Sequence, residues 1–132
     1  MLFSRVLLFA SSVLLFSGCA KSPYEDGARI YKAYCANCHM DTGEGLGALI
    51  PPVNGVAYIT QNHDRLPCLV RYGLQDSIVV NGKSYAEQMP PADKLSDIDI
   101  TNVLNYLNTH LGNRNPLFTL EGVRARLEKC KR

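Results

Sequence analysis

Residues 96–112 carry the clearest periodic pattern of apolar and polar positions in the chain. The apolar positions of one helix face, spaced i, i+3, i+4 and i+7, are Ile100, Val103, Leu104 and Leu107. Ser96 and Asp99 stand at the spacing of a capping box, with Asp in place of the usual Glu, and Gly112 ends the run. The pattern predicts one amphipathic helix that buries this face.

Two further stretches have helical signals. Ser22 and Pro23 are typical of a helix start, an N-cap followed by proline at the first position, and a face of small and aromatic residues continues to Cys35. A shorter helix is expected from about Arg65 to Tyr72, where a glycine ends it. The body of the chain is therefore expected to be all-α, with three to four helices.

The N-terminal segment has a different pattern. An apolar run from Val6 to Phe16 follows Arg5 and is too short to cross about 30 Å of hydrocarbon, so it indicates a secretory leader. Two small residues precede Cys19, which resembles the lipobox of bacterial lipoproteins. The resemblance implies that residues 1–18 are removed, that Cys19 is lipidated, and that the domain is held at a periplasm-facing membrane. The outer or the inner membrane of a Gram-negative bacterium fits this, and the alternative is an incidental thiol at Cys19.

The composition fits one globular domain. The chain has 132 residues, 46% hydrophobic and 20% charged, and its net charge of +2 is too small to indicate a nucleic-acid partner. The common dinucleotide, phosphate-loop, hydrolase and metalloprotease motifs are missing from the sequence. These observations exclude the common enzyme signatures and leave the five cysteines to be explained.

Cys35, Cys38 and His39 form a CxxCH sequence, the attachment signature of c-type haem. Two thiols at this spacing can bond to two vinyl groups of one porphyrin, and the following imidazole can then reach the iron. A thioredoxin-like pair would need a strand before it, and a zinc site would need a second pair of ligands close in the sequence. We therefore expect one covalently bound haem c in the chain.

An electron carrier needs a second axial ligand, for which methionine is a common choice. Met1 leaves with the leader, and Met40 is held beside His39 on the proximal side. Met89 remains, and Pro90 favours an extended segment there that can place the thioether on the distal side. We expect His39 and Met89 to be the iron ligands. Rival distal ligands are the other histidines, His63 and His110.

These motifs resemble the class I, mono-haem cytochromes c, from about Pro23 to Leu111. In that family a first helix with a small residue and an aromatic residue before the haem cysteines crosses the last helix closely. Gly27 and Tyr31 match the first helix, and Tyr106 matches the aromatic of the last. The resemblance implies the class I cytochrome c fold, with the helices packed around the haem.

The same resemblance implies two further residues at the haem. Pro51 matches the proline whose carbonyl accepts the N–H of the proximal histidine, and Tyr85 matches a tyrosine of the distal loop that reaches a haem propionate. It also implies an electron carrier with redox proteins as donor and acceptor, as a monomer or as the cytochrome subunit of a dehydrogenase or terminal reductase complex. A haem sensor is a further alternative if Met89 is labile.

The C-terminal segment 112–132 extends beyond the family's last helix. It has six basic and two acidic residues, whereas residues 19–111 have seven basic and ten acidic ones. We expect this basic extension either to fold back on the acidic body as a helix or to dock on an acidic partner or membrane surface.

Two cysteines, Cys68 and Cys130, are left once one cysteine is assigned to lipid and two to haem. An exported chain is exposed to oxidising conditions, so by elimination we expect a disulfide between them. The alternative is two single thiols.

Overall fold

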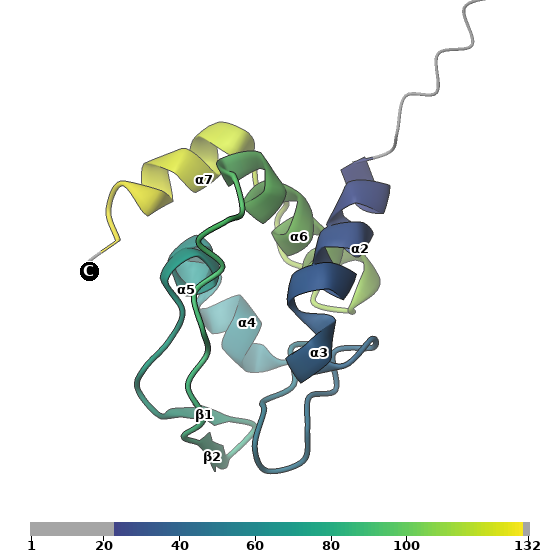
Figure 1. The fold of residues 1–132 in the computed structure, drawn as a ribbon, viewed down its shortest axis with the longest axis vertical. Coiled ribbons are helices and arrows are strands. Elements are labelled where there is room, and N and C mark those ends of the chain that lie inside the picture. The colour runs from purple at the N-terminus through teal and green to yellow at the C-terminus, as the bar shows by residue number, and fades with distance from the viewer. Residues whose placement is uncertain (1–22, 131–132) are drawn as a thin grey trace, which may run out of the picture.

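The computed structural model describes residues 23–130. This part of the chain is mostly helical, as predicted, and holds one very small sheet (Figure 1). In chain order the elements are α2 (Pro23–Tyr34), α3 (Ala36–His39), α4 (Ala57–Gln61), the 3-10 helix η2 (His63–Arg65), α5 (Leu66–Tyr72), β1 (Ile78–Val80), β2 (Lys83–Tyr85), α6 (Asp97–His110) and α7 (Leu120–Leu127). None of the described helices is long and apolar enough to cross a membrane.

Helices α2 and α6 cross at close range, and Gly27 makes the crossing possible. A Cβ atom at Gly27 would lie 2.4 Å from the backbone oxygen of Asn102 and 2.8 Å from the Cβ of Tyr106. Next to the crossing, the rings of Tyr31 and Tyr106 lie 5.5 Å apart between centroids. The helix crossing implied by the family resemblance is therefore confirmed.

Helix α6 begins and buries its apolar face as its sequence predicts. The Ser96 hydroxyl accepts the backbone N–H of Asp99, and the Asp99 carboxylate accepts the backbone N–H of Ser96, so the capping box is present. The four predicted core positions are all buried: Ile100, Val103, Leu104 and Leu107. The helix ends at His110, just before Gly112, whose φ of 76° suits glycine.

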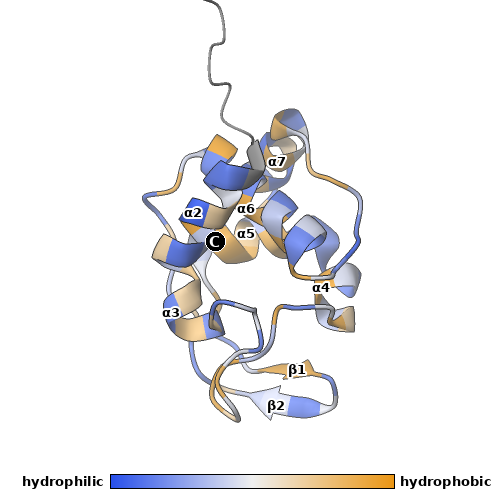
Figure 2. Ribbon diagram, turned by 90° about the vertical axis from the view of Figure 1, so that its right-hand side faces the viewer, coloured by the Kyte–Doolittle hydropathy of each residue, from blue (hydrophilic) through white to orange (hydrophobic). Residues whose placement is uncertain are grey.

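A small hairpin, β1 and β2, was not predicted from the sequence. It pairs three residues on each side, with Ile78 opposite Tyr85, and Asn81 and Gly82 form its turn with φ values of 51° and 76°. Figure 2 shows β1 as hydrophobic and β2 as largely hydrophilic, yet each strand buries only its last residue, Val80 in β1 and Tyr85 in β2. Short α4 was also missed, because five residues are too few to show a helical period.

The basic C-terminal segment folds back onto the body. Helix α7 buries Val123 completely and packs against α5 and α6. Arg126 pairs with Asp64 at 2.6 Å, and Arg124 pairs with Asp97 at 3.5 Å. Of the two expectations for this segment, the structure therefore favours folding back, since both arginines form ion pairs with acidic residues of the body.

A disulfide ties the same segment to α5. It joins Cys68 of α5 to Cys130, with a Cα–Cα distance of 5.7 Å. The C-terminal segment is thus held by apolar contacts, ion pairs and a covalent bond.

Candidate functional site

The CxxCH residues lie at the junction of α2 and α3. Cys35 separates the two helices, its N–H donates to the Tyr31 carbonyl at 2.8 Å, and its carbonyl accepts the His39 N–H at 2.9 Å. Cys35 and Cys38 are both free thiols, the first half-buried and the second exposed. One short helical turn therefore places two thiols and an imidazole within a few residues of one another. Burial raises the pKa of the Cys35 thiol to about 11.

The imidazole of His39 is oriented by a backbone carbonyl. Its Nδ1 lies 3.0 Å from the carbonyl oxygen of Pro51, the residue indicated by the family resemblance. Burial lowers the pKa of His39, so the neutral ring is favoured. A neutral ring that donates from Nδ1 keeps a lone pair on Nε2, which is the form needed to bind a metal.

The loop that carries Pro51 approaches His39 through a glycine. The Gly45 N–H donates to the His39 carbonyl at 3.0 Å. A Cβ atom on Gly45, whose φ is 73°, would lie 2.3 Å from the carbonyl oxygen of Ile50, so a side chain there would push the loop away. The loop is also tied down further along, where Val53 donates to the Gly43 carbonyl at 2.7 Å.

Cys35 and His39 face an apolar cavity between α2, α4, α5, α6 and β1. Cofactor sites are typically concave and lined mainly by apolar side chains, with a few polar groups that fix the orientation of the ligand. Met89 also lines it, so the cavity brings together one thiol, the imidazole and the thioether predicted from the sequence. The other lining residues are mainly apolar and include Leu69, Val70, Leu74, Ile78, Val103 and Leu104.

A second hollow contains some of the same residues and the exposed thiol. Cys38, His39, Tyr85 and Met89 line it together with Pro90. Tyr85 is itself only 5% exposed. The predicted residues therefore line two neighbouring hollows. Cys35 lines the first, Cys38 and Tyr85 line the second, and His39 and Met89 line both.

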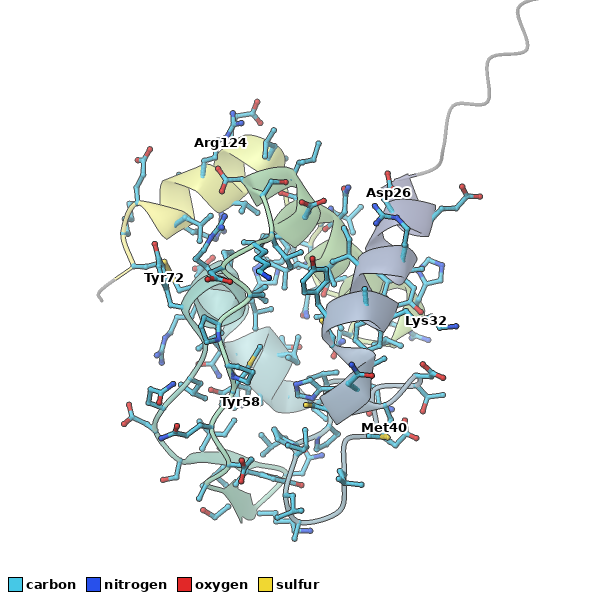
Figure 3. The ribbon with its side chains drawn as sticks, viewed as in Figure 1. Asp26, Lys32, Met40, Tyr58, Tyr72 and Arg124 are labelled. Atoms are coloured by element: carbon cyan, nitrogen blue, oxygen red, sulfur yellow. A yellow bond between two sulfur atoms is a disulfide. The ribbon has the colours of Figure 1, made fainter. Side chains whose placement is uncertain are left out.

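Tyr31 adds a polar contact that was not predicted from the sequence. Its hydroxyl donates to the Met40 carbonyl at 2.7 Å, while its ring lines the apolar cavity. Burial raises the pKa of Tyr31, so the phenol stays protonated and keeps donating. Figure 3 shows Met40 at the turn after α3, and Met40 is not among the residues that line either hollow.

The two rival histidines lie elsewhere. His63 stacks on Phe118, with ring centroids 4.1 Å apart, and its Nε2 lies 3.0 Å from the Pro116 carbonyl. His110 ends α6 and stacks on Tyr106. Neither histidine lines the cavity that contains His39 and Met89. Cys19 lies outside the described residues.

The donor set fits a haem better than a bare metal ion. In the described residues there is no group of three or more His, Cys, Asp and Glu side chains that could hold a metal. The cavity instead has an apolar lining with one imidazole and one thioether on its walls, a pair of side chains that can bind haem iron.

Comparison with known proteins agrees with this geometry. Residues 22–107 match the family model described as cytochrome c oxidase, cbb3-type, subunit III. The chain is 37% identical over 120 residues to cytochrome c-552 of Thermus thermophilus, covering 84% of this chain and 80% of that protein.

The chain also resembles part of a much longer protein, at lower identity. The chain is 33% identical over 94 residues to the cytochrome c subunit of the quinone alcohol dehydrogenase of Gluconobacter oxydans, covering 68% of this chain and 19% of that protein. The family match spans well over half of the chain and coincides with the α2–α6 crossing and the cavity beside it. The chain belongs to the cytochrome c family: it is an electron-transfer protein with a covalently bound c-type haem.

Proposed function

We propose that the haem is bound to Cys35 and Cys38, that His39 and Met89 are its axial ligands, and that the protein carries electrons between redox proteins at a membrane surface. The observation that carries the proposal is the apolar cavity with His39 and Met89 on its walls. When bound, the haem supplies a one-electron couple between ferric and ferrous iron.

The protein side chains would set how that couple behaves. The Pro51 carbonyl holds the His39 ring in one orientation, and Met89 on the cavity wall would supply the second ligand of the iron. With both ligands supplied by side chains, dioxygen or peroxide would find no open coordination site. The apolar lining excludes water, and a His/Met ligand pair favours a raised potential. These features suit electron transfer without bond chemistry.

The exposed side of the site supports exchange with a partner protein. Cys38 is exposed, and the hollow that it shares with Tyr85 and Met89 lies on the same side as the β1–β2 hairpin. An edge of the ring bound there would be close to the surface. Tyr85 is the proposed contact of a haem propionate, because it is buried against this hollow.

The proposed location is based on the expected leader, and the proposed partners are based on the relatives. Lipid on Cys19 would hold the domain at a periplasm-facing membrane, near membrane-bound redox enzymes. The alternative is a permanent subunit of a dehydrogenase or terminal reductase complex. The similarity to a dehydrogenase cytochrome subunit over 68% of the chain is the observation that favours this alternative.

The ligand set is tested by spectroscopy of the haem-loaded protein. Acid–acetone extraction should leave the colour on the chain, and a Cys35→Ala, Cys38→Ala double variant should lose covalent haem. Met89→Ala should abolish the long-wavelength charge-transfer band that reports a methionine–iron bond and should allow cyanide to bind. Met40→Ala is the matched control and should keep the band. If Met89→Ala keeps it, another group is the ligand.

The lipid anchor is tested by fractionation. Cys19→Ser should release the haem-loaded protein from the membrane fraction into the soluble periplasm. A variant that stays in the membrane fraction would show that another part of the chain, or a partner complex, holds the protein there.

A further inference from the structure

Met89 lies in a segment, residues 86–96, that connects β2 to α6 without regular secondary structure. A segment of this kind is held only by bonds to its neighbours, and here the neighbour is α5 with the residues after it. Leu74 and Met89 form an antiparallel bridge in which each N–H donates to the other's carbonyl at 2.9 Å. Further along, the Ala92 N–H donates to the Val70 carbonyl at 3.0 Å.

The side chain of Arg71 continues this row of contacts. Its Nη1 donates to the Leu95 carbonyl at 2.5 Å and to the Asp93 carbonyl at 3.4 Å. Its Nη2 donates to the Asp97 carboxylate at 2.7 Å, at the start of α6. The guanidinium therefore joins α5 to the end of the Met89 segment and to the helix that follows it.

Because Arg71 is largely buried, the loss of these contacts would be costly. Its side chain is 18% exposed, so most of a positive charge has been taken from water and must be matched by the acceptors around it. Two of the three acceptors are backbone carbonyls of the Met89 segment itself. A planar guanidinium can bond several acceptors at once in a fixed geometry, which an ammonium group does less well.

The packing at the end of α5 leaves little room for the segment to shift. A Cβ atom at Gly73 would lie 2.3 Å from the carbonyl oxygen of Met89 and 2.9 Å from the carbonyl carbon of Pro90. The backbones of the two segments thus already lie as close as glycine allows. Any loosening of the contacts made by residues 71–74 would therefore change the position of Met89.

From this geometry we propose that Arg71 is a positioning residue, which holds the Met89 segment against α5 and thereby keeps the thioether at the wall of the cavity. This inference rests on the proposed ligation by Met89. Without the guanidinium, the Leu95 and Asp93 carbonyls lose their donor, and the segment leaves its place more often. An added ligand then competes with the thioether more easily.

Arg124 provides a matched control. It also pairs with Asp97, at 3.5 Å, and its side chain is 58% exposed. In the described part of the chain it forms no bond to the Met89 segment. Arg124→Gln therefore removes a positive charge from the same carboxylate without touching the contacts that Arg71 makes with Asp93 and Leu95.

The first test is competition by imidazole in the oxidised, haem-loaded protein. Arg71→Gln should raise the affinity for added imidazole by about tenfold, the size expected for loss of hydrogen bonds from a charged group. Arg71→Lys should lie between Arg71→Gln and the unchanged protein, while Arg124→Gln should match the unchanged protein. If Arg71→Gln folds poorly, the imidazole affinity of Arg71→Lys is compared with that of the unchanged protein instead. Equal affinities for both Arg71 variants and the unchanged protein, or an equal rise in Arg124→Gln, would overturn the proposal.

The second test does not depend on the ligand. The amides of Leu74 and Met89, which donate across the bridge, should exchange with deuterium faster in Arg71→Gln but not in Arg124→Gln. Unchanged exchange would overturn the positioning role. If Met89→Ala keeps the charge-transfer band while these amides exchange faster in Arg71→Gln, the ligation proposal fails and the positioning of the segment stands.

Discussion

At the scale of single residues, the backbone at Met40 is the most unusual feature of the site. Its φ of 63° and ψ of 165° fall in a region that is adopted almost only by glycine and costs of order 1–3 kcal/mol for other residues. Its carbonyl accepts both the Tyr31 hydroxyl, at 2.7 Å, and the Gly43 N–H, at 3.2 Å. These two bonds hold the strained residue directly after His39, so strain is stored next to the proximal ligand.

Relief of this strain should be measurable as stability. We expect Met40→Gly to have a free energy of unfolding about 1–2 kcal/mol higher than Met40→Ala, because both lose the thioether but only glycine adopts the observed angles freely. Denaturant unfolding of the two haem-loaded variants gives the comparison. Equal stability, or a more stable alanine variant, would mean that the backbone at this position relaxes.

Part of the site could be predicted residue by residue, and part could not. Cys35, Cys38 and His39 form a local motif, and Met89 follows by elimination among three methionines, so the sequence holds enough to propose them. Arg71 was missed because two of its three acceptors are backbone carbonyls and all three lie more than twenty positions away. Backbone acceptors have no residue type, so no sequence pattern marks them.

At the scale of elements, the start of α6 depends on the capping box. Hydrogen bonding from Ser96 holds the pKa of Asp99 below its ordinary value of about 4. A carboxylate with a lowered pKa in the folded state stabilises the fold above the ordinary aspartate pKa, and this contribution disappears as the pH falls through the lowered value.

Ser96→Ala should therefore lower the free energy of unfolding by about 1 kcal/mol at neutral pH, and the difference should shrink in acid. Unfolding measured at several pH values tests this. Thr119→Ala is the control, because Thr119 caps α7 by accepting the Gly122 N–H at 3.0 Å and has no carboxylate partner in that cap. The loss of unfolding free energy in Thr119→Ala should vary less with pH. Parallel pH profiles for the two variants would contradict the role of Asp99.

The elements that were predicted are those whose signals lie within one helix. The apolar spacing and capping residues of α6 indicated its start and its buried face. The hairpin was missed even though Asn81 and Gly82 are typical turn residues, because three-residue strands are too short to show alternation. The strands are held in place by packing, with Val80 and Tyr85 buried in the core, and a sequence pattern does not contain that information.

At the scale of the whole molecule, the C-terminal segment is held by a bond that closes a long loop. The disulfide joins residues 62 positions apart, and loop-closure entropy gives about 4 kcal/mol for such a bond. A Cys68→Ser, Cys130→Ser double variant should lose about this much stability and become sensitive to proteases between α6 and the C-terminus. Its haem spectrum should not change, because neither cysteine lines the cavity.

Arg126→Gln is a useful control for the disulfide variant. It removes the ion pair with the exposed Asp64 but keeps the covalent bond, so the tail should remain resistant to proteases. Limited proteolysis followed by mass spectrometry distinguishes the two variants. Equal resistance in the double cysteine variant would show that the apolar contacts and ion pairs hold α7 in place without the covalent bond.

The central cavity also bears on how the protein should mature. Its walls come from elements far apart in the sequence, among them α2 and α6, and close packing is the usual source of cohesion between helices. A newly made polypeptide that has not yet received its prosthetic group should lack part of the contacts that hold those walls together, and its apolar faces should be open to proteases. Attachment should therefore protect the chain from degradation, so that the chains that last are those already able to carry an electron.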